Sequence, residues 1–237
     1  SDEAFIQAYE ESLKAFVARY GPDGSFFADY PDLPYRPVQF VEIWNEPNFQ
    51  YMIPPRQGVA RPAIEAERNA LYAKALPAAY QVIKDASSQV KVVGFAAGGA
   101  SAGDLRFIKA THELNAKVAD SYDILSTHPY VHPAAPEAYS VRGWGQYSIA
   151  SSLATVRQTM DQYGAGDRPV WYTEIGWPIS HGDGGMFEDK PNATFVSPLL
   201  QAAYVCRLYA MAERLGVGRV HVMYISDADG FNGGFFN

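Results

Sequence analysis

Short apolar runs alternate with longer amphipathic segments along the chain, and this rhythm limits the possible folds more than any other feature. Five apolar runs have the length and composition of strands: 38–43, 90–96, 124–127, 169–173 and 219–225. Helical spacing of apolar residues precedes or separates them at 2–20, 62–86, 104–118, 146–163 and 198–215. Strands that alternate with helices in this way are typical of a parallel sheet with right-handed crossovers. The sequence therefore predicts an α/β fold.

Two parallel architectures can hold five such strands. An open doubly wound sheet usually carries a GxGxxG turn after its first strand, but FAAGGASAG at 95–103 does not match that pattern. The alternative is a (β/α)8 TIM barrel of which this chain covers strands 4 to 8. A five-stranded slice of a barrel would expose two strand edges, so we expect the N-terminal strands to come from sequence before Ser1.

Length and composition narrow the class of protein. The 237 residues fit a single, partial TIM-barrel catalytic domain over 1–237, because barrels commonly contain about 250 residues. The net charge of −7 disfavours a nucleic-acid partner. No apolar run approaches the roughly 20 residues that span a bilayer, so no membrane partner is expected. Cys206 is the single cysteine, and its apolar helical surroundings predict a buried, inert thiol.

Polar residues follow the predicted strands directly. Glu46 comes after the first strand and Glu174 after the fourth, while His128 and Tyr130 follow the third. Because a buried charge is costly unless it is paired or used, two glutamates in such positions indicate a function. Glycoside hydrolysis needs one carboxylic acid to protonate the leaving oxygen and a second carboxylate to attack or to direct water. In a retaining enzyme the two carboxyls lie about 5–5.5 Å apart, against roughly 6.5–9.5 Å in an inverting one.

Three motifs resemble those of clan A glycoside hydrolases. VEIWNEPN at 41–48 resembles the fourth-strand motif of the clan, STHPY at 126–130 its sixth-strand segment, and VWYTEIGWP at 170–178 its seventh-strand motif. The order of the motifs is also that of the clan. The pattern is most similar to glycoside hydrolase family 39 and to bacterial family 5 relatives.

The resemblance implies a role for each matching residue. Glu46 would be the general acid and then the general base, and Glu174 the nucleophile. Asn45 would bind the sugar 2-hydroxyl, or would be a turn cap. Tyr130 would donate a hydrogen bond to Glu174. His128 would contact Glu46 or the sugar, or would be a structural histidine bonded to backbone.

Three tryptophans are candidates for substrate binding. Trp177 lies past a strand end, which favours a platform on which a sugar stacks over a residue that packs within the fold. Trp44 either has the same role or packs within the barrel. Trp144, on the loop after the third predicted strand, would line a distal subsite or pack against the loop.

Together these features predict a retaining glycoside hydrolase that cleaves β-linked glycosides through a covalent glycosyl-enzyme. The long loops after the strands favour a polysaccharide substrate. A non-catalytic carbohydrate-binding barrel and a transglycosylase that uses the same intermediate are the alternatives. No metal or cofactor is expected, because the mechanism requires none and the five histidines lack zinc-ligand spacing. We expect a secreted or periplasmic location, with any export signal upstream of Ser1; the oligomeric state is left open.

Overall fold

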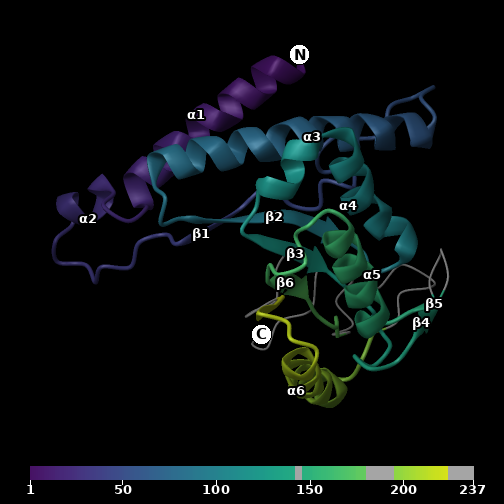
Figure 1. The fold of residues 1–237 in the computed structure, drawn as a ribbon. Helices are drawn as coiled ribbons and strands as arrows, with labels where there is room; N and C mark the ends of the chain where they lie inside the picture. Colours follow the sequence, from purple (N-terminus) through teal and green to yellow (C-terminus); the bar gives the residue numbers. More distant parts are fainter. Residues whose placement is uncertain (142–145, 180–194, 224–237) are drawn as a thin grey trace. The chain divides into compact units, whose positions relative to one another are not determined.

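A computed structural model describes residues 1–141, 146–179 and 195–223 of the chain. Five strands form one sheet in the order in which they occur along the chain. They are β1 (Phe40–Glu42), β2 (Lys91–Gly98), β3 (Ile124–His128), β6 (Val170–Ile175) and β7 (Arg219–Val222) (Figure 1). The pairs β1–β2 and β6–β7 are parallel, with Val41 opposite Val92 and Tyr172 opposite Val220. The predicted α/β fold with a parallel sheet is therefore confirmed.

The helices lie close to the ranges predicted from the sequence. They are α1 (Asp2–Tyr20), α2 (Ser25–Asp29), α3 (Arg61–Ala86), α4 (Ala102–Leu114), the 3₁₀ helix η1 (Ala116–Asp120), α5 (Ile149–Gln162) and α6 (Pro198–Arg214). The short helix α2 lies between the first predicted helix and the first predicted strand, in a segment for which the sequence indicated neither.

Two predicted helices are shorter than expected, each because a side chain ends or starts it. The range 104–118 is interrupted at Asn115, whose Oδ1 accepts a hydrogen bond from the backbone N–H of Lys117 at 3.1 Å and so caps η1. The range 146–163 starts later, because β5 (Gln146–Tyr147) pairs antiparallel with β4 (Ser140–Val141). Ser148 then caps α5, since its Oγ accepts from the N–H of Ser151 at 3.1 Å.

The chain divides into two units, and each is described by itself. Unit 1 consists of residues 1–97, 107–126 and 159–168, and unit 2 of residues 98–106, 127–158 and 169–237. In unit 1, α1 packs against α3 (Figure 1), where Lys74 forms an ion pair with Asp2 at 2.9 Å. Strand β2 is buried at every position after Lys91, which explains its almost uninterrupted apolar sequence.

A buried histidine belongs to the aromatic core of unit 1. The His112 ring stacks between Phe95 and Tyr163, with centroid distances of 5.3 and 4.7 Å. Its Nδ1 lies 2.8 Å from the carbonyl oxygen of Ile108. Burial lowers the pKa of His112 below its ordinary value, and the charge of Arg168 lowers it further. His112 is therefore neutral in the folded protein near pH 7.

This histidine should make the stability of the protein depend on pH. The pKa of His112 is lower in the folded protein than in the unfolded chain, so protonation of His112 favours the unfolded state. The free energy of unfolding should therefore fall as the pH drops below about 6.5. We expect His112→Phe to reduce this slope, by at most about 1.4 kcal/mol per pH unit. Urea unfolding at pH 5, 6 and 7 measures it. Thr111 is a buried neighbour without a titrating group, so Thr111→Val is the control and should change the stability but not its slope with pH. Equal slopes for wild type and His112→Phe would contradict the prediction.

The glycine-rich segment after β2 forms a helix cap in unit 2. Ser101 and Asp104 bond reciprocally, since Ser101 Oγ accepts from the N–H of Asp104 and Asp104 Oδ2 accepts from the N–H of Ser101, both at 3.2 Å. Gly99 has a φ of 85°, and the space beside its Cα is filled by the Asp104 carboxylate. This packing accounts for the glycine, which the sequence alone left unexplained.

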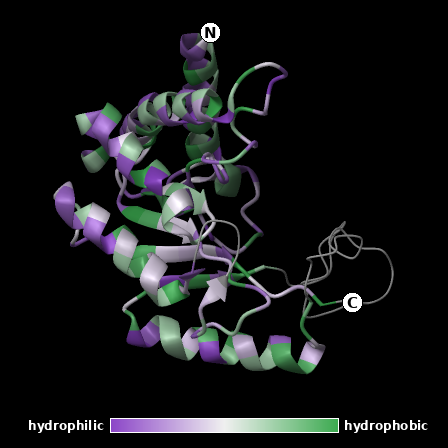
Figure 2. Ribbon diagram, turned by 90° about the vertical axis from the view of Figure 1, so that its right-hand side faces the viewer, coloured by the Kyte–Doolittle hydropathy of each residue, from purple (hydrophilic) through white to green (hydrophobic). Residues whose placement is uncertain are grey.

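The prediction that Cys206 is buried is wrong. Its thiol is exposed on α6, the helix at the bottom of Figure 2, and α6 buries Gln201, Leu208 and Ala212 instead. Apolar residues occur almost all round this helix, so their pattern did not show which face is covered. No helix in the described part of the chain is both long and apolar enough to cross a bilayer.

Candidate active site

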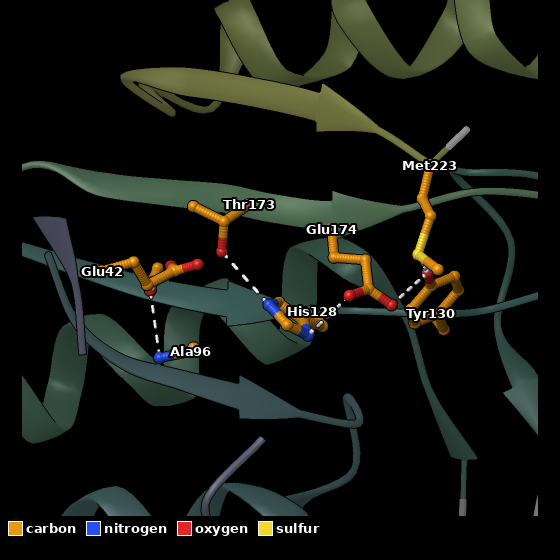
Figure 3. Close-up of polar contacts among 8 residues, drawn as sticks. Glu42, Ala96, His128, Tyr130, Thr173, Glu174 and Met223 are labelled. Atoms are coloured by element: carbon orange, nitrogen blue, oxygen red, sulfur yellow. Dashed lines mark hydrogen bonds and ion pairs between the residues drawn. The ribbon is translucent and has the colours of Figure 1, made fainter. Parts of the chain in front are cut away.

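Glu174 is the centre of a polar group in unit 2. It lies near the end of β6, and its side chain is 23% exposed. The Tyr130 hydroxyl donates a hydrogen bond to Glu174 Oε1 at 2.6 Å, and His128 Nδ1 lies 3.6 Å from Oε2 (Figure 3). The expected bond between Tyr130 and Glu174 is therefore present. Both partners come from the segment in which β3 ends, which the sequence had indicated as STHPY.

Further contacts fix the two partners of Glu174. His128 is buried, and its Nε2 lies 3.2 Å from Thr173 Oγ1, on the strand that carries Glu174. The Tyr130 hydroxyl also lies 3.1 Å from Met223 Sδ. Thr173 and Met223 were not among the predicted site residues. A carboxylate held by a hydroxyl donor keeps one orientation and is stabilised in its ionised form, which suits a nucleophile.

Removal of the Tyr130 hydroxyl should impair a reaction at Glu174. We expect Tyr130→Phe to lower kcat by about 10- to 100-fold, because the carboxylate loses a charge-assisted hydrogen bond of about 1.5–3 kcal/mol. Steady-state kinetics on an aryl β-glycoside measures the effect. Tyr139→Phe is the matched control, since Tyr139 is 64% exposed in the same unit. A Tyr130→Phe variant as active as this control would contradict the assignment.

Glu46 lies in a strained turn of unit 1 and is 9% exposed. Trp44 and Glu46 have φ angles of 68° and 44°, in the left-handed region that residues other than glycine seldom adopt. The backbone N–H of Glu46 donates a hydrogen bond to the carbonyl oxygen of Ala96 at 3.1 Å. The carbonyl oxygen of Glu46 accepts one from the N–H of Phe49 at 2.9 Å. Such strain persists where surrounding structure holds it, and it is often found at functional sites.

Two residues of β2, the strand next to this turn, also have left-handed backbone angles: Phe95 (φ 81°) and Ala96 (φ 41°). The Tyr72 hydroxyl holds this segment, because it accepts from the N–H of Phe95 at 2.6 Å and donates to the carbonyl oxygen of Ile43 at 3.1 Å. Burial raises the pKa of Tyr72 well above its ordinary value, so this hydroxyl keeps its proton. Tyr72 thus connects the end of β1 to the backbone that binds Glu46.

Ser126 supports the same segment from β3. Its Oγ accepts a hydrogen bond from the N–H of Ala96 at 3.0 Å and donates one to Glu42 Oε1 at 2.6 Å. Tyr72 and Ser126 were both missed as site residues. Ser126 belongs to the quoted motif STHPY, which could have indicated it, whereas Tyr72 lies within a helix whose sequence gives no such signal.

Tyr72 is therefore a candidate positioning residue for Glu46. In Tyr72→Phe the Phe95 N–H and the Ile43 carbonyl lose their partner, so the Glu46 turn should shift. We expect turnover to fall by up to about 100-fold, the effect of a displacement of roughly 1 Å. The fall should be larger for glycosides with poor leaving groups, which need the acid most. The turnover rates of a series of aryl glycosides whose leaving groups differ in pKa measure this dependence. Tyr80→Phe on the same helix is the control. A purely structural role would lower all the rates alike.

Trp44 and Asn45 precede Glu46. The Trp44 ring is half-buried and meets Phe5 and Tyr9 of α1 edge-on, with centroids 5.5 and 5.7 Å apart. These contacts favour the interpretation in which Trp44 packs within the fold. Asn45 is exposed, and its contact with a sugar hydroxyl stays a prediction.

The prediction that Trp177 is an exposed stacking platform is wrong. Its side chain is 1% exposed, and its indole N–H donates to the carbonyl oxygen of Ala134 at 2.8 Å. The Trp177 ring also meets Tyr204 of α6 edge-on, and Gln201 Nε2 donates to the Trp177 carbonyl at 2.9 Å. Trp177 therefore connects α6 to the loop after β3. Trp144 lies outside the described residues.

The two glutamates thus have distinct settings. Glu174 of unit 2 contacts a hydroxyl and an imidazole, whereas Glu46 of unit 1 is held through its backbone. Because they belong to different units, their pairing across one bond stays a prediction.

Comparisons with known proteins find similarity in structure alone. No family model matches the sequence, and no curated protein matches it. A family 39 glycoside hydrolase from Bacteroides cellulosilyticus WH2 is 22% identical, with a TM-score of 0.55 over 82% of this chain and 36% of the other. A glucosidase from Croceicoccus marinus is 18% identical, with a TM-score of 0.59 over 98% of this chain and 42% of the other.

A GH39 β-xylosidase from Caulobacter crescentus is 18% identical, with a TM-score of 0.56 over 98% of this chain and 43% of the other. This chain thus spans less than half the length of each of the three structures. At these identities the similarity concerns the fold, and it favours part of a barrel over an open doubly wound sheet. The resemblance to clan A glycoside hydrolases is confirmed at that level.

Proposed function

We propose that this chain carries the catalytic residues of a retaining glycoside hydrolase. The observation that supports the proposal most is the setting of Glu174. Its carboxylate accepts a hydrogen bond from the Tyr130 hydroxyl at 2.6 Å and lies beside the buried His128. Glu46, on a strained turn after β1, is the second carboxyl group that the reaction needs. The order of these motifs along the chain and the structural similarity to glycoside hydrolases agree with this proposal.

The reaction would proceed in two displacements. In the first, the Glu174 carboxylate attacks the anomeric carbon while Glu46 gives its proton to the glycosidic oxygen, so the glycosidic bond breaks and a glycosyl ester forms on Glu174. In the second, Glu46 takes a proton from water, the water oxygen attacks the anomeric carbon, and the ester bond breaks. Both steps require the carboxyl groups to lie about 5–5.5 Å apart. No metal takes part in either step.

The proposed substrates are β-linked glycosides. The β-xylosidase and the glucosidase among the similar structures are consistent with this class, and the long segments after β1 and β3 favour a polysaccharide. The correspondence of the five strands to barrel strands 4 to 8 belongs to the same proposal, as does a secreted or periplasmic location.

The stereochemistry of the first product tests the proposed function. The protein is incubated with aryl β-glycosides and with xylans, glucans, mannans and galactans, and the anomeric proton of the released sugar is followed by ¹H NMR. We expect the β anomer to appear first and then to mutarotate. An α anomer formed first would contradict retention, and binding without any release would favour a non-catalytic barrel. Transfer to an added sugar in preference to water would favour a transglycosylase.

A further inference from the structure

The left-handed segment of β2 supports the turn that carries Glu46. Its two residues, Phe95 and Ala96, adopt a backbone conformation that costs free energy in residues other than glycine, so it persists only where its surroundings hold it. The carbonyl oxygen of Ala96 accepts the hydrogen bond of the Glu46 N–H at 3.1 Å. A shift of this segment would therefore move the turn of Glu46.

Side-chain hydroxyls hold the N–H groups of both left-handed residues. The Phe95 N–H donates to the Tyr72 hydroxyl at 2.6 Å, and the Ala96 N–H donates to Ser126 Oγ at 3.0 Å. Both hydroxyl side chains are buried, Tyr72 on α3 and Ser126 on β3. A hydroxyl has a single proton, so its oxygen accepts such a bond only while that proton points elsewhere. The group that takes the proton therefore decides how firmly the segment is held.

Two consecutive residues of β1 take these protons. Tyr72 donates to the Ile43 carbonyl oxygen at 3.1 Å, and Ser126 donates to Glu42 Oε1 at 2.6 Å. The Gly94 carbonyl oxygen, 3.1 Å from Ser126 Oγ, is a second and neutral acceptor within reach. A carboxylate is a stronger acceptor than a carbonyl oxygen, and its bond here is the shorter one. The carboxylate of Glu42 thus sets the direction of the Ser126 hydroxyl.

We propose that Glu42 is a positioning residue for Glu46 and acts through Ser126. The Glu42 carboxylate holds the Ser126 proton, the Ser126 oxygen then holds the Ala96 N–H, and the Ala96 carbonyl oxygen holds the Glu46 N–H. Every member of this series belongs to unit 1. The inference rests on the proposed function, because it gives Glu42 a part in the action of Glu46 as acid and base. Glu42 itself transfers no proton to the substrate.

Hydrogen exchange at the Glu46 amide tests the link without any substrate. The exchange rate is measured by NMR in wild type, Ser126→Ala and Glu42→Leu. The internal reference is the Lys91 amide, which donates to the Gln39 carbonyl oxygen at 2.8 Å at the other end of the same two strands. We expect exchange at Glu46 to rise about three- to tenfold relative to Lys91 in both variants, the effect of one lost hydrogen bond.

The dependence of turnover on the leaving group separates positioning from stability. Ser126→Ala and Glu42→Leu should lower the turnover of glycosides with poor leaving groups by about 10- to 100-fold, and that of activated aryl glycosides much less. The double variant should be no slower than Ser126→Ala, because Glu42 acts through that hydroxyl. Glu42→Gln keeps an acceptor oxygen and should retain most of the turnover. Glu11→Leu, at an exposed position on α1 in the same unit, is the control and should match wild type.

Four outcomes would overturn the proposal. Unchanged exchange at Glu46 in Glu42→Leu and Ser126→Ala would show that the link is absent, and equal losses for both classes of substrate would show a role in stability alone. Losses that multiply in the double variant would show that Glu42 acts independently of Ser126. A Glu42→Gln variant as slow as Glu42→Leu would show that the charge of Glu42 acts directly. A wild-type protein that hydrolyses no glycoside would instead contradict the proposed function, while the exchange rates would still decide the link.

Discussion

Replacement of Glu174 by Gln is expected to lower kcat by about 10⁴-fold or more, the largest effect in the molecule. The amide has nearly the shape of the carboxylate and can still accept a hydrogen bond from Tyr130, so the fold should be kept. It cannot form the glycosyl ester, because a neutral amide oxygen is a poor nucleophile. Steady-state hydrolysis of the best aryl β-glycoside measures the loss.

A matched control separates chemistry from folding. Glu213→Gln makes the same change at an exposed position on α6 in the same unit and should leave turnover within about twofold of wild type. Thermal unfolding should give similar Tm values for both variants. A Glu174→Gln variant with more than about a tenth of wild-type turnover would show that another group is the nucleophile.

Replacement of Glu46 by Ala should have the second-largest effect, and this effect should depend on the leaving group. Alkyl leaving groups need protonation, so their glycosides should react about 10²- to 10⁴-fold more slowly. Activated aryl groups such as dinitrophenolate leave without an acid, so the first step should persist. The second step loses its base, and the glycosyl-enzyme should accumulate.

A stopped-flow experiment measures this second prediction. With a dinitrophenyl glycoside, Glu46→Ala should give a rapid burst of phenolate equal to the enzyme concentration, followed by slow turnover. Glu113→Ala, at an exposed position on α4, is the control and should show wild-type rates for both classes of substrate. Equal losses for activated and unactivated substrates would show that Glu46 is not the acid/base.

The sequence predicted the features of this molecule that depend on local pattern. All five strands and every long helix lie within a few residues of their expected ranges, because apolar periodicity records which face of each element is buried. The bond between Tyr130 and Glu174 was expected from the resemblance of their motifs to those of clan A glycoside hydrolases. Sheet geometry alone predicted only that the ends of the parallel strands lie at one edge.

Features that depend on tertiary contacts were not predictable in this way. The supporting roles of Tyr72 and Ser126 arise from left-handed backbone at Phe95 and Ala96, and a run of apolar strand residues gives no sign of such a conformation. Trp177 is buried because α6 and the loop after β3 pack around it, although its position after a strand suggested exposure. The exposure of Cys206 likewise depends on which face of α6 is covered.

The configuration of the azide product tests the division of roles between the two glutamates most directly. Azide is added to the Ala variants of Glu174 and Glu46 with an activated aryl β-glycoside, and the anomeric configuration of the glycosyl azide is determined by ¹H NMR. Glu174→Ala should give the α-glycosyl azide, because azide replaces the nucleophile in a single displacement. Glu46→Ala should give the β-glycosyl azide, because azide attacks the covalent intermediate. The opposite configurations, or no rescue of either variant, would contradict the account.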